Sequence, residues 1–229
     1  MTYVLIPGAG GEAWYWHRVV TELERRGRSA VAVELPAGDE RAGWAEYADV
    51  VVAAADGVET PVVVAQSMGG FTGPLVVERL GVPLLVLVNA MIPRPGETGG
   101  DWWENTGQST AQAEFAAAQG RVVGEGMDEM AVFFHDVPDD VTAEAMRRGD
   151  PSQSMTPFAQ PFPLERWPDV PTRVVAGRDD RLFPLEFQRR VAQDRLGLAV
   201  EEVPGGHLAA LSRPVELVDR LEAYVAELG

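Results

Sequence analysis

Short runs of apolar, mostly β-branched residues recur from the start of the chain up to Val88, and amphipathic stretches separate them. Continuous runs of Val, Leu and Ile favour the strands of a parallel sheet that helices cover on both faces. We expect strands over Tyr3–Ile6, Ala30–Glu34, Pro61–Ala65 and Leu84–Val88, and helices over Trp14–Arg26, Trp44–Asp56 and Gly70–Leu80. This alternation predicts a doubly wound, mainly parallel α/β sheet with right-handed crossovers.

The alternation breaks between about Asn89 and Pro171, a region rich in Gly, Pro, Trp and Met. The region is too long for an unstructured loop in a compact domain. Its apolar residues form helix-like clusters, and we expect it to be a helical cap insertion covering approximately residues 90–170. The predicted helices are Ala111–Gln119, Met127–Phe134 and Val141–Arg148, and an extended return path is expected over Asp150–Pro163.

The strand and helix pattern resumes after the insertion. It predicts strands over Arg173–Gly177 and Ala199–Val203 and a closing amphipathic helix over Pro214–Leu228. The chain of 229 residues is long enough for one sizeable core. We therefore expect a single domain over residues 1–229 with about six strands.

Ser67 lies where the Pro61–Ala65 strand gives way to the next helix, in the run Ala65-Gln66-Ser67-Met68-Gly69. This run matches the G-x-S-x-G nucleophile elbow, with alanine in place of the first glycine. The elbow strains the backbone at the serine, so that its Oγ stands clear of the sheet. The motif is short and common, so the assignment of Ser67 as a nucleophile depends on its partners.

Those partners follow in the chain order of an α/β-hydrolase triad, which is serine, acid, histidine. An acidic pair comes after one predicted strand, and His207 comes after the next. Both would lie at the carboxyl edge of a parallel sheet, where ligands bind in open α/β folds. The spacing from Gly177 favours Asp180 as the acid. Asp179 is expected to be a solvated loop residue or a partner of a neighbouring arginine.

Two other histidines are weaker candidates for the base. His17 falls inside the first helix and is expected to be structural, while His135 in the cap is a candidate to line the substrate pocket. Six cap aromatics are candidates for the pocket wall, although we expect most of them to form the core of the cap. They are Trp102, Trp103, Phe115, Phe133, Phe134 and Phe158.

Ester cleavage by a serine also needs donors for the developing oxyanion. The backbone N–H of Met68 is one candidate, and the N–H of Ala9, in the Gly-rich loop after the first strand, is the other. A Gly-rich loop after a strand can also bind phosphate. The run Pro7-Gly8-Ala9-Gly10-Gly11 lacks the G-x-G-x-x-G spacing, and the chain has no Walker lysine, so we reject a nucleotide site.

Composition narrows the chemistry further. The formal net charge of −16 disfavours binding to nucleic acid or to an anionic membrane. The chain has no Cys, and all 19 basic residues are Arg, which excludes thiol nucleophiles, zinc–thiolate sites and Schiff-base lysines. No apolar run approaches ~20 residues, so no membrane span is expected. We expect a soluble, cytoplasmic protein, and the sequence does not indicate its oligomeric state.

The opening Leu5-Ile6-Pro7-Gly8-Ala9-Gly10-Gly11-Glu12-Ala13-Trp14-Tyr15-Trp16-His17-Arg18 resembles that of the plant methylesterase and hydroxynitrile lyase group and its bacterial esterase relatives. The resemblance extends to the elbow, to the segment from Asp180 to Gln188, to Gly205-Gly206-His207 and to the cap. It implies an α/β-hydrolase fold with a short cap and cofactor-free Ser-His-Asp catalysis.

Two positions depart from the lyases of that group, which carry a threonine at position 8 and a lysine directly after the catalytic histidine. This chain has Gly8 and Leu208 there. A lyase of that type uses the cation to stabilise departing cyanide, whereas ester hydrolysis needs neither group. We therefore expect a serine hydrolase that cleaves a small, largely apolar ester. The alternatives are a receptor-like protein with little turnover and a non-hydrolytic enzyme, either a lyase or a cofactor-free oxygenase.

Overall fold

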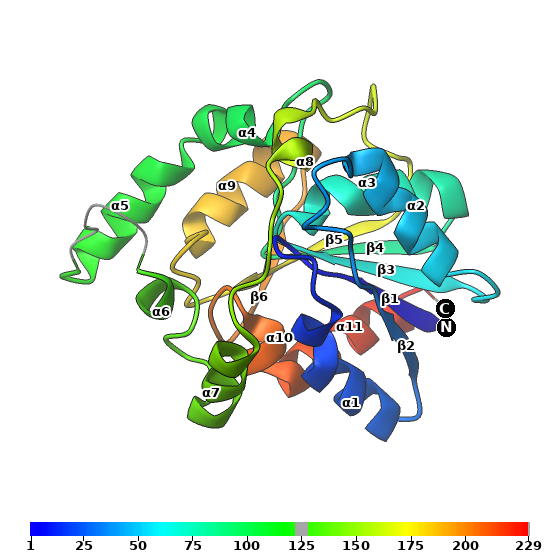
Figure 1. Ribbon diagram of the computed structural model, residues 1–229, viewed down its shortest axis with the longest axis horizontal. Coiled ribbons are helices and arrows are strands. Elements are labelled where there is room, and N and C mark those ends of the chain that lie inside the picture. Colours follow the sequence, from blue (N-terminus) through cyan, green and yellow to red (C-terminus); the bar gives the residue numbers. More distant parts are fainter. Residues whose placement is uncertain (122–127, 229) are drawn as a thin grey trace.

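The computed structural model describes residues 1–121 and 128–228. Its centre is a six-stranded sheet in the order β2-β1-β3-β4-β5-β6, and every neighbouring pair is parallel (Figure 1). The predicted α/β sheet of about six strands is confirmed, and it is parallel throughout. The strands are β1 (Thr2–Ile6), β2 (Ser29–Ala32), β3 (Pro61–Gln66), β4 (Leu84–Val88), β5 (Thr172–Gly177) and β6 (Val200–Val203).

Alternate side chains of each central strand enter two separate cores. In β3, Val62 and Val64 pack on one side of the sheet, and Val63 and Ala65 pack on the other. Because both faces are buried, the strand reads as a continuous apolar run. The first face is covered by α1 (His17–Arg25), α10 (Ala209–Ser212) and α11 (Pro214–Ala226), and the second by α2 (Trp44–Ala54), α3 (Gly69–Leu80) and α9 (Leu185–Leu196).

The predicted boundaries differ from the structure mainly in the first βα unit. The expected helix over Trp14–Arg26 is divided into a 3-10 turn, η1 (Ala13–Trp16), and α1. The second strand ends at Ala32, two residues before the predicted end, and the N–H of Val33 makes one further bond to β1, at the carbonyl of Leu5 (3.0 Å). The N–H of Leu35 then donates to the carbonyl of Gly11 in the Gly-rich loop (2.8 Å).

In the predicted cap segment (residues 90–170), between β4 and β5, the described residues form five helices. They are α4 (Gly99–Thr106), α5 (Gln108–Ala118), α6 (Glu129–Val132), α7 (Asp139–Arg148) and α8 (Thr156–Ala159). Met127, the predicted start of the α6 region, lies outside the described residues. The path over Asp150–Pro163 is not extended throughout as predicted, because it contains α8. The sequence prediction also missed α4, although a capping box marks its start: Thr98 and Asp101 each accept the other's backbone N–H (3.0 and 3.1 Å). None of the described helices is both long and apolar enough to span a bilayer.

Candidate active site

Ser67 lies on a tight turn between β3 and α3. Its φ angle is 51°, which is rare for a residue with a side chain, so the expected backbone strain is present. Its N–H donates to the carbonyl of Val88 (3.2 Å), and its own carbonyl accepts from the N–H groups of Gly70 (3.0 Å) and Met91 (2.9 Å). These bonds hold the serine against the end of β4 on one side and the first turn of α3 on the other.

The two glycines after the elbow allow this close approach. A Cβ atom at Gly70 would lie 1.8 Å from the carbonyl oxygen of Met91, and one at Gly69 would lie 2.9 Å from that of Pro7. Distances of this size exclude any side chain at position 70. The need for small residues, predicted for the positions around Ser67, is strictest at Gly70, one residue beyond the motif.

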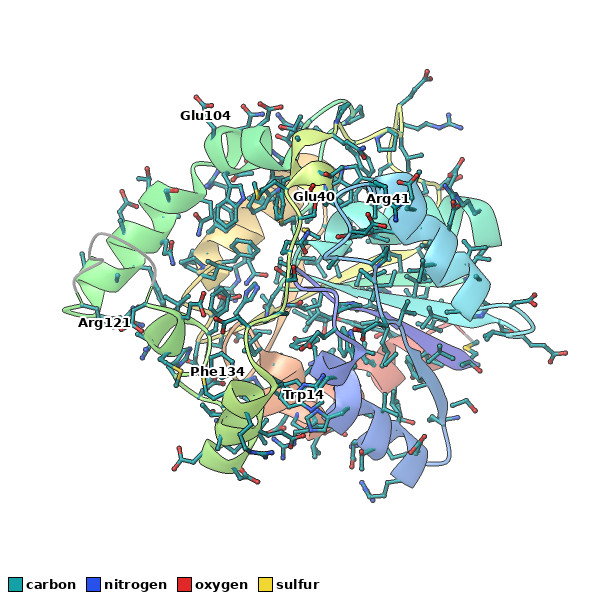
Figure 2. The ribbon with its side chains drawn as sticks, in the orientation of Figure 1. Trp14, Glu40, Arg41, Glu104, Arg121 and Phe134 are labelled. Atoms are coloured by element: carbon teal, nitrogen blue, oxygen red, sulfur yellow. The ribbon has the colours of Figure 1, made fainter. Side chains whose placement is uncertain are left out.

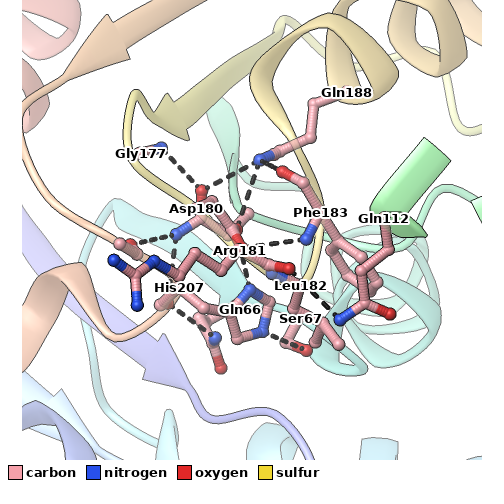
Figure 3. Close-up of polar contacts among 12 residues, drawn as sticks. Gln66, Ser67, Gln112, Gly177, Asp180, Arg181, Leu182, Phe183, Gln188 and His207 are labelled. Carbon is pink, nitrogen blue, oxygen red and sulfur yellow. Dashed lines mark hydrogen bonds and ion pairs between the residues drawn. The ribbon is translucent and has the colours of Figure 1, made fainter. Parts of the chain in front are cut away.

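The structure brings Ser67, Asp180 and His207 together, although they lie on three separate loops (Figure 3). His207 Nε2 is 3.0 Å from Ser67 Oγ, and His207 Nδ1 is 2.8 Å from Asp180 Oδ2. The imidazole therefore bridges the hydroxyl and the carboxylate. Its ring also contacts the rings of Phe183 and Phe133 edge-on, at centroid distances of 5.0 and 5.5 Å.

Asp180 is fully buried, and both oxygens of its carboxylate accept hydrogen bonds. Its Oδ1 accepts the N–H groups of Leu182 and Phe183, both at 2.8 Å, and its Oδ2 accepts from His207 and lies 3.3 Å from Gln188 Nε2. Such bonds offset the cost of burying a charge and fix the direction of the carboxylate. The sequence prediction missed Gln188, because no motif marks a glutamine on a helix face.

Asp179 points away from this arrangement, as predicted. Its side chain is half-exposed and pairs with Arg178 (3.5 Å). It also accepts the N–H of Gly205 at 3.3 Å, so it supports the turn before His207 from outside. Adjacent carboxylates thus lie in two environments, one buried against the imidazole and one at the surface.

The remaining histidines lie apart from Ser67. His17 stacks on Trp14 (4.7 Å between ring centroids) and bonds to the carbonyl of that residue (2.8 Å), which is a structural role. His135 does not line the cavity. It is partly buried against Gly206, where a Cβ atom would lie 2.7 Å from its Nε2, and this burial lowers the pKa of its imidazole.

The loop Pro7–Gly11 lies directly beside the elbow. A Cβ atom at Gly8 would be 2.8 Å from Ser67 Cβ. Within residues 1–121 and 128–228, no protein acceptor bonds to the amide N–H of Ala9 or of Met68, and both residues line the cavity next to Ser67. Two unoccupied donors beside a serine hydroxyl are what a developing oxyanion requires.

The segment Asp150–Pro163, which returns from the cap to the sheet, holds the Pro7–Gly11 loop in place. The sequence prediction missed this contact. Gln153 Oε1 accepts the N–H of Gly10 (2.9 Å), and the amide nitrogen of Gln153 donates to Tyr47 Oη (3.2 Å) and to the carbonyl of Ser154 (2.8 Å). The ring of Pro151 packs against Gly10, where a Cβ atom would lie 2.7 Å away. A segment some 140 residues distant along the chain therefore holds the residue next to Ala9.

A cavity of about 410 Å³ lies against Ser67 and His207. Most of its wall is apolar. Burial raises the pKa of Tyr15, so this phenol stays neutral and forms part of that wall. Four of the six cap aromatics line the cavity, namely Trp103, Phe133, Phe134 and Phe158, so the expectation that most of them would be core alone was wrong. Trp102 is fully buried, as expected of a core residue.

At one end of the cavity, α7 of the cap segment contacts η1 and the loop residue before it. Figure 2 shows Trp14 and Phe134 at this end of the molecule. The indole N–H of Trp14 donates to Glu144 (3.3 Å), and the guanidinium of Arg148 lies 5.2 Å from the Trp14 ring centroid. Arg148 also pairs with Glu12 (3.4 Å). In the described part of the chain, no three acidic or histidine side chains are grouped to hold a metal ion.

Comparison with known proteins agrees with this architecture. A model of the alpha/beta hydrolase family matches residues 3–220. This chain belongs to that family. It is 27% identical to a probable esterase of rice (Oryza sativa subsp. indica), PIR7A, over 98% of this chain and 97% of the relative. A 24% identical relative, polyneuridine aldehyde esterase of Rauvolfia serpentina, covers 94% of this chain and is itself covered over 92%.

Solved structures share the same fold. Polyneuridine aldehyde esterase superposes with a TM-score of 0.76 at 22% identity, over 98% of both chains. A pyrethroid hydrolase of Sphingobium faniae JZ-2 superposes with a TM-score of 0.73 at 21% identity, over 99% of this chain and 97% of the other. The predicted α/β-hydrolase fold and the predicted likeness to plant esterases are confirmed, the bacterial neighbour is a hydrolase of the same fold, and the chain is an esterase-type member of the family.

Proposed function

We propose that this protein hydrolyses carboxylic esters through a covalent acyl-enzyme, with Ser67 as the nucleophile. One observation carries the proposal: His207 lies within hydrogen-bond distance of both Ser67 Oγ and the buried carboxylate of Asp180, and the serine faces an apolar cavity. This arrangement has the nucleophile, base and orienting acid that acyl transfer by a serine requires.

In the proposed reaction, Ser67 Oγ attacks the ester carbonyl while His207 Nε2 takes its proton. Asp180 accepts the Nδ1–H of the imidazole and stabilises the imidazolium as it forms. The N–H groups of Ala9 and Met68 donate to the oxyanion. His207 then protonates the departing alkoxide, and afterwards activates a water molecule that releases the acid and restores Ser67.

The apolar wall of the cavity favours an ester substrate with apolar groups on both sides of its carbonyl. One part of the wall packs with the core beneath α2, α3 and α9, and the other with the core beneath α1, α10 and α11. Ser67 lies between these parts, so we propose that the acyl and alcohol groups occupy opposite sides. The first part includes Met91, Trp103, Phe158, Leu182 and Phe183, and the second Trp14, Tyr15, Phe134, Leu208 and Leu211.

The same geometry argues against cyanohydrin cleavage. Leu208 lines the cavity directly after His207 and offers no charge to a departing cyanide. At Gly8, a Cβ atom would also lie 2.8 Å from Ser67 Cβ and 2.5 Å from Gln66 Oε1, so a hydroxyl-bearing side chain at this position would require both neighbours to shift.

The test combines labelling with two substrates. A fluorophosphonate probe should label the protein at Ser67, and mass spectrometry of the labelled peptide identifies the residue. Small aryl or methyl esters should then be hydrolysed, while mandelonitrile should not be cleaved above background. Ser67-dependent cyanide release as fast as ester hydrolysis would favour the lyase, and ligand binding without turnover would favour the receptor-like alternative. The cytoplasmic location and the lack of nucleic-acid or membrane partners stay predictions.

A further inference from the structure

Asn89 is the residue directly after β4, and its side chain is buried among the loops of the candidate site. It is fully inaccessible to solvent, and its φ angle is 46°. Among residues with a side chain, asparagine is one of the few that adopt this left-handed conformation readily. The turn directs the side chain across the end of β5 toward the loop that carries His207.

Every hydrogen-bonding position of the Asn89 amide is occupied. Its Oδ1 accepts the N–H of Gly177 (2.7 Å) and lies 3.3 Å from Gln188 Nε2. Its Nδ2 donates to the carbonyl of Gly206 (3.1 Å) and to that of His207 (3.0 Å). Because the Gly177 N–H requires an acceptor and the two carbonyls require donors, only one orientation of the amide fits.

These bonds connect the loops that carry the acid and the base. Gly177 ends the strand before Asp180, and Gln188 also lies 3.3 Å from the carboxylate of Asp180. The carbonyl of His207 is within reach of a second amide, that of Gln66 (3.4 Å), which precedes Ser67. The Asn89 side chain therefore lies at the centre of a buried network that joins all three loops.

We propose that Asn89 is a positioning residue of this site, which sets the distance of His207 from both Asp180 and Ser67 through the backbone of the His207 loop. This inference rests on the proposed hydrolase function. A displacement of reacting groups by about 1 Å is enough to cost about 10²-fold in rate. Asparagine suits the position because it combines two donors and two acceptors on a short side chain that tolerates a positive φ.

The test uses two substitutions that keep the backbone free of strain. Asn89→Gly removes the amide, and glycine adopts a φ of 46° without cost. Asn89→Asp keeps the size of the side chain and its acceptor bonds to Gly177 and Gln188, but loses both donors to the His207 loop. Thr106→Val is the matched control, because within the described residues its buried hydroxyl bonds only to the carbonyls of Trp102 (2.7 Å) and Trp103 (3.5 Å) in α4.

Ester hydrolysis is measured per active site, with the folded, reactive fraction counted by fluorophosphonate titration. We expect both Asn89 variants to lose about 10²-fold in kcat per titrated site with KM nearly unchanged. Thr106→Val should lose thermal stability but keep its rate per site. A merely structural role of Asn89 would lower the melting temperature and the titrated fraction without slowing the sites that remain.

Rates per site within about twofold of the control in the Asn89→Asp variant would overturn the inference. Should Asn89→Gly not fold, Asn89→Asp decides by itself, because it preserves the volume and the acceptor bonds. The wild-type protein separates the two claims. If it neither labels at Ser67 nor hydrolyses esters, the hydrolase proposal fails and the inference falls with it; if it does both and the variants match the control, only the inference fails.

Discussion

The loops around Ser67, Asp180 and His207 and the inner surface of the cap segment both face the cavity, but different interactions hold them. Around these three residues, buried carboxylate and amide groups bond to backbone N–H and C=O groups at the strand ends. The cap presents aromatic rings to the cavity, and its large exposed apolar side chains include Met130, Met146 and Met155. Hydrogen bonds have strict geometry, whereas apolar packing is not directional.

The difference indicates that the strand-end loops and the cap segment have separate roles. The proposed proton transfer from Ser67 to His207, with Asp180 orienting the imidazole, depends on distances near 3 Å, so these groups need the directional support that the strand-end loops supply. Recognition of an apolar ester depends on buried area and tolerates small shifts. We therefore expect substitutions in the loops to reduce the rate for every ester, and substitutions in the cap to change the order of preference among esters.

The largest effect is expected at the centre of the loop region. Ser67→Ala removes the nucleophile from a side chain that projects into the cavity, so the fold should be unaffected. Turnover of a p-nitrophenyl ester should fall by about 10⁴- to 10⁶-fold, the range found when triad members are removed from serine hydrolases. A variant that keeps more than about a tenth of the activity would contradict the assignment of the nucleophile.

The adjacent acids provide a matched pair in the same loop. Asp180→Asn should lower kcat by about 10⁴-fold, because an amide at this position favours the wrong imidazole tautomer. Asp179→Asn changes a half-exposed carboxylate and should have a far smaller effect. Steady-state kinetics of both variants on one ester test this. A larger loss of kcat in Asp179→Asn than in Asp180→Asn would show that Asp179, and not Asp180, is the acid.

Two exposed methionines allow the same comparison in the cap. Met146 is half-exposed and lines the cavity, whereas Met155 is 70% exposed and does not. Met146→Ala should lower kcat/KM for a long-chain ester by about threefold to tenfold through lost apolar contact, with little change for an acetate ester. Met155→Ala is the control and should alter neither rate. Equal losses for both esters would count against a role of the cap in selectivity.

The smallest effect is expected at His135, a cap residue that packs against the turn before His207. Burial lowers the pKa of its imidazole below the usual 6.5, and Asp136, Asp179, Asp180 and Arg181 face it. A depressed pKa means that the unfolded state binds protons more readily, so the native state loses stability as the pH falls through about 6.5. Urea unfolding at about pH 7 and pH 5 should show this loss, and His135→Gln should reduce it. An undiminished loss in the variant would assign the pH dependence to other groups.

Much of the fold was predictable because local signals and tertiary structure agree. The run Leu84–Val88 was predicted to the residue, since a strand buried on both faces needs continuous apolar side chains. The tight turn at Ser67 was predictable from the small residues around it. The helix α4 was missed although Thr98 and Asp101 carry its capping signal, because glycines and tryptophans obscured the periodicity of the segment.

The sequence by itself determined the order of the strands along the chain, the elbow, and the succession of serine, acid and histidine. These depend on spacing and on apolar runs, which are local. Only the tertiary structure decided which cap aromatics line the cavity, that Gln153 holds the Gly-rich loop, and that the amide of Asn89 lies between the loops of Asp180 and His207. Those contacts join residues 88 to 143 positions apart, and a side chain's partner at such a separation depends on how whole layers pack.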